Sequence, residues 1–128
     1  ISNLTNNINP KLVSPNISRD LIYIDDVIDI YIRSCGIKEV NGEIINLASG
    51  KNTQLKKIFS VIKKETNSKI TPIWNSMENR DWDQEYWVAD VKKFNKIYNK
   101  KKLIPLKLGI KKFYSWYKIN KKYYNDKS

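Results

Sequence analysis

Apolar residues along the chain fall into two kinds of pattern. Short runs rich in strand-forming residues occupy positions 21–24, 43–47 and 70–74. Other apolar residues return every three or four positions, as they do at Leu55, Ile58, Phe59 and Ile62. Spacings of three and four place side chains on one face of a helix, whereas a short continuous run is typical of a buried strand. About three short strands alternating with helices predict an α/β fold.

Polar residues stand just before the periodic stretches, where helices begin. We expect Asp25 to cap one helix and Thr53 to cap another, because short polar side chains satisfy the first free N–H groups. Asp26 would complement the positive end of the first of these helices. Two more helices are expected, over residues 89–98 and from residue 106 onward.

Composition and charge limit the classes of protein that the chain can represent. It has 128 residues, enough for one domain with a modest core. No run approaches the roughly 20 apolar residues of a membrane helix. The net charge is +11 and is concentrated at one end: residues 92–128 hold 13 lysines and one acid, whereas residues 1–91 are nearly neutral. Such asymmetry is typical of proteins that meet nucleic acid or an anionic surface.

The chain has no histidine and a single cysteine, Cys35. Disulfides, Cys/His nucleophile pairs and Cys/His metal sites are therefore excluded within these residues, and we predict no metal site. Cys35 stands among apolar neighbours near the end of the first helix, so we expect it to be a small buried side chain. An unpaired cysteine fits a reducing compartment, and we expect the cytoplasm.

Arginine is rare where lysine is abundant, with three arginines against 21 lysines. Where lysine is the default cation, an arginine indicates a site that needs a guanidinium, which binds phosphate through two parallel hydrogen bonds. Arg19 precedes a strand and Arg80 lies in an aromatic loop, so both are candidates for a ligand site at strand ends. Structural ion pairs with neighbouring acids are the alternative for both. Arg33 lies within a helix, where a solvated surface role is expected.

The loop that begins near residue 80 combines the residue types that hold a nucleotide. Arg80 and Asp83 flank Trp82, and Tyr86 and Trp87 follow. A guanidinium, a carboxylate and flat aromatic rings suit a diphosphate, a ribose and a base, respectively. From the residues alone, the alternative is a loop whose tryptophans fill a gap in the core.

Four segments, in order along the chain, share their motifs with one known family. The first is Arg-Asp-Leu-Ile-Tyr-Ile-Asp-Asp-Val at residues 19–27. The second is Gly-Glu-Ile-Ile-Asn-Leu-Ala-Ser-Gly at residues 42–50, in which Ala48 departs from the usual glycine. The third has the spacing Arg-x-x-Asp and then Ala-Asp-x-x-Lys within residues 80–93, and the fourth is the helix at residues 105–117. Together they resemble the C-terminal part of the NAD-dependent nucleotide-sugar epimerases and dehydratases, which are extended short-chain dehydrogenases.

This resemblance implies both a fold and a function. The fold would be the C-terminal, substrate-binding portion of an extended Rossmann-type dehydrogenase, here a single domain over residues 1–128. In the family, the residues that match Arg19 and Arg80 contact the nucleotide diphosphate, and the residue that matches Asp83 contacts the ribose. The implied role is to bind a nucleotide sugar for an epimerase, dehydratase or reductase.

The family's cofactor and catalytic elements are missing from this sequence. There is no G-x-x-G-x-x-G loop after a strand, and the one Tyr-x-x-x-Lys spacing of note, Tyr98 with Lys102, falls in a basic linker. The resemblance therefore implies that NAD or NADP is bound by an N-terminal half outside these residues. We expect no catalytic residue here and no activity from the chain alone. Apolar surface left uncovered by that half would favour a homodimer or low stability.

A small basic binding module is the alternative function. Residues 107–128 interleave lysines with aromatic residues, which suits single-stranded nucleic acid or an anionic membrane surface. Of these two partners, peripheral membrane contact is favoured over nucleic acid. The simpler interpretation is a helix that docks Phe113, Trp116 and Tyr117 on the domain and turns its lysines to solvent.

Overall fold

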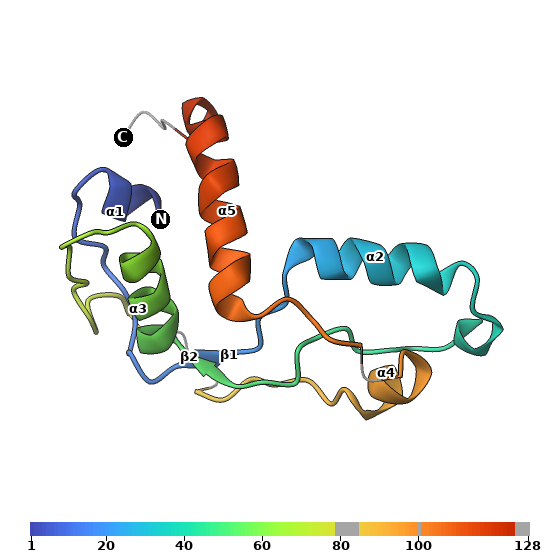
Figure 1. The fold of residues 1–128 in the computed structure, drawn as a ribbon. Coiled ribbons are helices and arrows are strands. Elements are labelled where there is room, and N and C mark those ends of the chain that lie inside the picture. Colours follow the sequence, from blue (N-terminus) through green and yellow to red (C-terminus); the bar gives the residue numbers. More distant parts are fainter. Residues whose placement is uncertain (79–84, 100, 125–128) are drawn as a thin grey trace.

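A computed structural model describes residues 1–78, 85–99 and 101–124 of the chain. The elements, in order, are α1 (Ser2–Thr5), β1 (Ser18–Arg19), α2 (Ile24–Ser34), the 3-10 helix η1 (Lys38–Val40), β2 (Thr53–Gln54), α3 (Leu55–Glu65), α4 (Lys92–Ile97), α5 (Leu106–Asn120) and the 3-10 helix η2 (Lys121–Tyr123). Figure 1 shows α1, α3 and α5 grouped together, with α2 projecting away from them and the short β1–β2 ribbon crossing below.

The main packed unit is formed by α3 and α5, which lie against each other. The predicted apolar stripe of α3 faces α1 and the segment around Leu12, as its helical spacing requires. From α5, Tyr117 is buried, and its hydroxyl accepts a 3.4 Å hydrogen bond from Thr5 Oγ1. The buried apolar residues of the described chain are Leu4, Ile17, Ile30, Ala48, Phe94 and Tyr117.

The two strands form an antiparallel ribbon in which Ser18 pairs with Gln54 and Arg19 with Thr53. The ladder continues past the strands, because the backbone N–H of Leu55 donates a 2.8 Å hydrogen bond to the carbonyl oxygen of Ile17. The ribbon therefore joins the start of α3 to the segment that leads into α2.

The three strands predicted from the apolar runs are wrong in position. β1 ends at Arg19, Ile24 already belongs to α2, and residues 43–47 form no strand. In the third run Ile73 makes a single parallel bridge, to Lys11. An extended run becomes a strand only where the N–H and C=O groups of a second strand line up beside it. Among the described residues the first two runs have no such neighbour, and the third has only the short segment around Lys11, whose backbone bonds Ile73. Short strands and helices nevertheless alternate along the chain.

The helices lie where the periodicity predicts them, and α5 begins at Leu106 as expected, but the first residues of α2, α3 and α4 differ from the prediction. α2 follows Tyr23 and α3 follows Gln54, and neither of these cap residues makes a side-chain capping hydrogen bond. Asp25 is therefore not an N-cap, and it lies with Asp26 in the first turn of α2, where acids complement the helix dipole. Thr53 belongs to β2 rather than capping α3.

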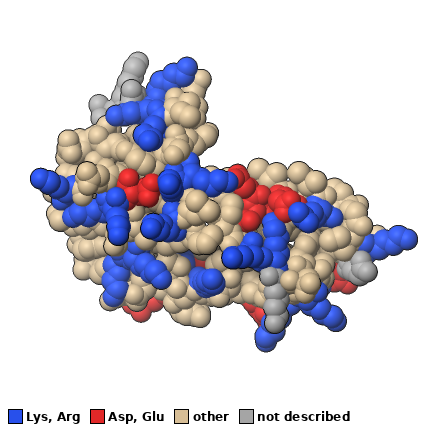
Figure 2. Space-filling view, viewed as in Figure 1, with Lys and Arg blue, Asp and Glu red and all other residues tan. Residues whose placement is uncertain are grey.

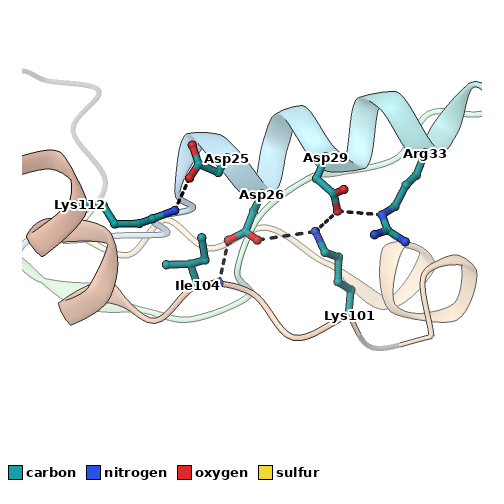
Figure 3. A network of polar contacts seen from close by, with 7 residues as sticks. All are labelled: Asp25, Asp26, Asp29, Arg33, Lys101, Ile104 and Lys112. Atoms are coloured by element: carbon teal, nitrogen blue, oxygen red, sulfur yellow. Dashed lines mark hydrogen bonds and ion pairs between the residues drawn. The ribbon is translucent and has the colours of Figure 1, made fainter. Parts of the chain in front are cut away.

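Acidic side chains attach one face of α2 to the linker before α5 (Figure 3). Asp26 is buried and accepts a 2.7 Å hydrogen bond from the backbone N–H of Ile104. Lys101 Nζ lies 2.5 Å from Asp29 Oδ2 and 3.7 Å from Asp26 Oδ1. The hydrogen bonds from Lys101 and Arg33 lower the pKa of Asp29 below its ordinary value. As expected, Arg33 is exposed on the helix surface, paired with Asp29 at 2.8 Å.

The opposite face of α2 carries an exposed apolar stripe. Its members are Ile24, Ile28, Tyr31 and Ile32, each at least half exposed. Cys35 continues the stripe and is also exposed, so the prediction of a buried cysteine is wrong. The periodicity was that of a helix with a buried face, but this face is largely exposed; at its start, Ile24 lines a hollow together with residues of α5. The predicted exposure of apolar surface is confirmed here.

Candidate functional site

Arg19 lies at the end of β1, where the ribbon meets the rest of the chain. The two preceding residues, Ile17 and Ser18, are buried, while Arg19 itself is half-buried. Its Nη1 donates a 2.8 Å hydrogen bond to the carbonyl oxygen of Ser18. Directly opposed residues of a ribbon place their side chains on the same face. Arg19 and its partner Thr53 therefore share one face.

The next residue, Asp20, holds the turn at residues 48–50. Its Oδ1 accepts hydrogen bonds from the backbone N–H of Ser49 at 2.8 Å and from Ser49 Oγ at 2.5 Å. Its Oδ2 accepts hydrogen bonds from the backbone N–H of Gly50 at 2.9 Å and of Ala89 at 3.4 Å. The sequence suggested Asp20 only as an ion-pair partner of Arg19. The signal that could have identified this role is the Ser49-Gly50 turn, whose backbone N–H groups need a hydrogen-bond acceptor.

The turn itself requires glycine at position 50 and tolerates alanine at position 48. Gly50 has φ +67°, and a Cβ there would lie 2.7 Å from a methyl carbon of Val91. Ala48 is buried and is not among the described residues with positive φ, so its departure from the family's glycine causes no backbone strain. The turn can thus pack closely against the segment that contains Val91.

Residues 85–91 run beside β1 and this turn. The backbone N–H and the hydroxyl of Ser18 both donate hydrogen bonds to the carbonyl oxygen of Glu85, at 2.9 and 3.0 Å. At the other end of the segment, Asn46 Nδ2 donates a 3.2 Å hydrogen bond to the carbonyl oxygen of Asp90. The predicted site residues Arg80 and Asp83 lie outside the described residues, so their part in a site with Arg19 stays a prediction.

A hollow of about 290 Å³ opens next to the turn. Thr53, the partner of Arg19, lies on its wall together with Ser49 from the turn. Three lysines also contribute to the lining. Lys51 and Lys102 are exposed, whereas the ammonium group of Lys101 is engaged by acids of α2. The hollow therefore presents cationic and hydrogen-bonding groups that could hold an anionic ligand.

Residues that follow the aromatic loop divide into exposed and structural groups. Tyr86 and Trp87 are 66% and 59% exposed, so their ring faces are accessible to a ligand. Asp90 Oδ1 accepts a 2.9 Å hydrogen bond from the backbone N–H of Lys92, the first residue of α4. Lys93 forms an ion pair with Glu43, whose pKa it lowers by a hydrogen bond and by its charge. Asp90 and Lys93 thus have structural partners.

Tyr98 and Lys102 lie beyond the end of α4. α4 ends at Ile97, so the four-residue spacing does not place the two side chains on one helical face. The hydroxyl of Tyr98 hydrogen-bonds that of Ser34 at 2.5 Å, and its ring stacks on Phe94. These contacts join α4 to α2, which is a structural role.

The basic C-terminal segment, residues 107–128, contains most of α5, which packs on α1 and α3 along one side. Tyr117 is buried against α1, as a docked helix requires, whereas Phe113 and Trp116 are 44% and 45% exposed. Figure 2 shows lysines and arginines spread over the visible face, with a smaller acidic group along the start of α2. The described helices include none with the length and apolarity needed to cross a membrane.

Comparisons with known proteins define the relationship. No family model matches the chain. The uncharacterized protein MJ1055 of Methanocaldococcus jannaschii is 32% identical over 106 residues, which cover 83% of this chain and 32% of that protein. A putative UDP-glucose 4-epimerase of the same organism is 30% identical over 105 residues, or 82% of this chain and 32% of that protein.

The fold agrees with that of a solved epimerase. The UDP-glucose 4-epimerase of Thermotoga maritima, in a structure with UDP-glucose, superposes with a TM-score of 0.79 at 17% identity, over 92% of this chain and 37% of that one. The chain matches a C-terminal part of the NAD-dependent nucleotide-sugar epimerase and dehydratase family. The resemblance found in the motifs and the predicted fold class are both confirmed.

The curated relatives are longer than this chain. The chain spans about a third of the length of the curated relatives that it matches. Residues 21–24, between the arginine and the acids of the first family motif, are a strand-forming run that joins no sheet among the described residues.

Proposed function

We propose that the chain is the substrate-binding part of an NAD-dependent nucleotide-sugar epimerase, dehydratase or reductase. In this proposal Arg19 and Arg80 bind the diphosphate of the nucleotide sugar and Asp83 binds its ribose. The observation that carries the proposal is the pairing of Arg19 with Thr53, which puts the two side chains on one face of the ribbon, together with the place of Thr53 on the wall of the hollow. The motif match supplies Arg80 and Asp83.

The residue types suit the chemistry of such a ligand. A guanidinium can donate two parallel hydrogen bonds to phosphate oxygens, which an ammonium cannot reproduce. A carboxylate can accept hydrogen bonds from both ribose hydroxyls. The named relatives support this ligand class, since one is described as a putative UDP-glucose 4-epimerase and another was solved with UDP-glucose.

The described residues do not fit a dinucleotide. The phosphates of NAD are bound where a parallel strand leads through a glycine-rich turn into a helix. Here the described sheet is a single antiparallel pair, and the turn at residues 48–50 already contains the carboxylate of Asp20. We therefore propose that NAD or NADP is bound by an N-terminal half beyond these residues, and that the chain is not catalytic by itself.

The surface of the chain supports the presence of such a half. Its accessible area is 9733 Å². A compact monomer of 15.1 kDa would expose about 7,100 Å². The excess of roughly 2,600 Å² is well above the about 800 Å² that each partner buries in an ordinary interface. We propose that the N-terminal half covers the apolar stripe of α2, with a homodimer as the alternative, and that the protein is cytoplasmic.

The test is binding of uridine diphosphate, measured by calorimetry on the polypeptide as its cells make it. Arg19→Lys and Arg80→Lys should each weaken binding at least about tenfold, because a buried or bidentate contact to phosphate is lost. Arg33→Lys is the matched control, since Arg33 is exposed and its pair with Asp29 lies on α2. Unchanged affinity in both site variants would refute the proposed roles.

The basic module is the remaining alternative. Its supporting observation is the exposure of lysines along α5 next to Ile119 and Tyr123, which are 80% and 69% exposed. If this face binds an anionic membrane, deletion of residues 107–128 should abolish binding to vesicles with acidic lipids, and binding should fall steeply with salt. Because the deletion also removes the helix that packs on α3, the double variant Lys107→Glu, Lys111→Glu separates the two functions: it keeps Tyr117 docked, and it should abolish vesicle binding but leave binding of uridine diphosphate unchanged.

A further inference from the structure

Asp20 makes an unusually complete set of contacts for a partly exposed carboxylate. Each of its two oxygens accepts two hydrogen bonds, Oδ1 from the main chain and side chain of Ser49, and Oδ2 from the main chains of Gly50 and Ala89. These partners come from two segments that lie 29 and 69 residues away along the chain. One side chain therefore joins the end of β1 to two distant loops.

The turn that receives Asp20 has the geometry of an anion site. The N–H groups of Ser49 and Gly50 converge on one point, and Gly50 has positive φ. Successive N–H groups in such a conformation form a concave donor site that favours a negative charge. Here the charge is supplied by the protein itself, so the turn is held in place rather than left open for a ligand.

Both residues that flank Arg19 form hydrogen bonds to the segment at residues 85–91. Ser18 bonds the carbonyl oxygen of Glu85, at the start of the segment beside β1, and Asp20 bonds Ala89 further along the same segment. The backbone of Arg19 is held between these two connections, while Ser49 of the turn lines the hollow. Asp20 thus helps to hold the backbone of Arg19 against the turn that contributes Ser49 to the hollow.

We infer that Asp20 is a positioning residue for the nucleotide-diphosphate site, acting through the backbone of Arg19 and the turn at residues 48–50. The inference rests on the proposed function, because it assumes that Arg19 binds the diphosphate. A displacement of about 1 Å in a binding group can reduce its effect by one to two orders of magnitude. Asp20 would then affect the affinity for the ligand without touching it.

The test uses uridine diphosphate, the polypeptide as its cells make it, and two variants. Asp20→Ala should reduce affinity at least about tenfold, and added formate should restore it by occupying the vacated position between Ser49 and Gly50. Asp20→Asn keeps the shape but offers an oxygen on one side only, so that its amide N–H₂ faces either the N–H groups of Gly50 and Ala89 or the N–H group of Ser49. It should lose affinity to a similar extent and should not respond to formate, since no space is vacated.

Asp25→Ala is the matched control, a carboxylate that also accepts a hydrogen bond, from Lys112, but belongs to α2 and does not line the hollow. It should bind uridine diphosphate with unchanged affinity and show no formate effect. If Asp20→Ala binds as well as the unmodified protein, or formate fails to restore its affinity, the inference is overturned. If both Asp20 variants fail to fold where Asp25→Ala folds, Asp20 serves folding alone, which also overturns it. If the unmodified protein does not bind uridine diphosphate, the proposed function fails first.

Discussion

Removal of the Asp26 carboxylate should destabilise the attachment of α2 more than any other change to its acidic face. Asp26 is 5% exposed, and it accepts a 2.7 Å hydrogen bond from the backbone N–H of Ile104. Asp26→Ala leaves that N–H without its acceptor in a partly buried position. Lys101 retains a partner, because its ammonium group remains 2.5 Å from Asp29.

The magnitude follows from these contacts. A hydrogen bond to a charged group contributes about 1.5–3 kcal/mol to stability. The ion pair with Lys101, at 3.7 Å, is longer than a hydrogen bond and adds less. We therefore expect Asp26→Ala to lower the free energy of unfolding by about 2–3 kcal/mol. Asp26→Asn should cost roughly 1 kcal/mol, because its amide oxygen can still accept from Ile104.

The assay is unfolding by urea, followed by circular dichroism, with Asp25→Ala as the neighbouring control. Asp25 also forms an ion pair, with Lys112, but both side chains are largely solvent-exposed, so its loss should be clearly smaller. A small effect of Asp26→Ala, or an equal effect of Asp25→Ala, would show that the bond to Ile104 does not hold α2. The reasoning from burial would then be refuted.

Two further predictions concern the turn and the response to pH. Gly50→Ala should destabilise the protein by about 2–4 kcal/mol, because it adds a clash with Val91 to the backbone strain. Gly42 has φ +71° but lies in open space, so Gly42→Ala should cost only about 1 kcal/mol. Equal losses of stability in urea unfolding would contradict the clash at position 50. The lowered pKa values of Asp29 and Glu43 mean that their ion pairs contribute stability above the ordinary values of 3.8 and 4.5, and that this contribution is lost as pH falls through the folded-state values. The pKa of Lys112 is raised by its hydrogen bond to Asp25, so its contribution is present below 10.5 and is lost as pH rises through the folded-state value. Urea midpoints measured against pH should therefore fall at both low and high pH. In the double variant Asp29→Asn, Glu43→Gln the fall at low pH should be smaller. If the fall at low pH is unchanged, it does not come from the ion pairs of Asp29 and Glu43.

Much of the helical structure was predictable from local patterns. The stripe of α3 and the start of α5 at Leu106 follow from residue spacing, because periodicity depends only on which side of a helix each residue occupies. The family was also recognisable, since its motifs are short stretches of sequence in a set order. The candidate Arg19 came from the same source, as an arginine next to a strand-forming run in a lysine-rich chain.

The sequence by itself determined the class, the family and the helices of this protein, because these depend on the order and spacing of residues along the chain. The tertiary structure alone decided which runs became strands, which side of α2 was covered and what the acids bonded. A strand needs a partner from a distant segment, so residues 21–24 could not be judged alone. The prediction that Cys35 is buried was wrong because it depended on another segment covering that face of α2. Asp20 holds a turn 29 residues away, a contact that only folding creates.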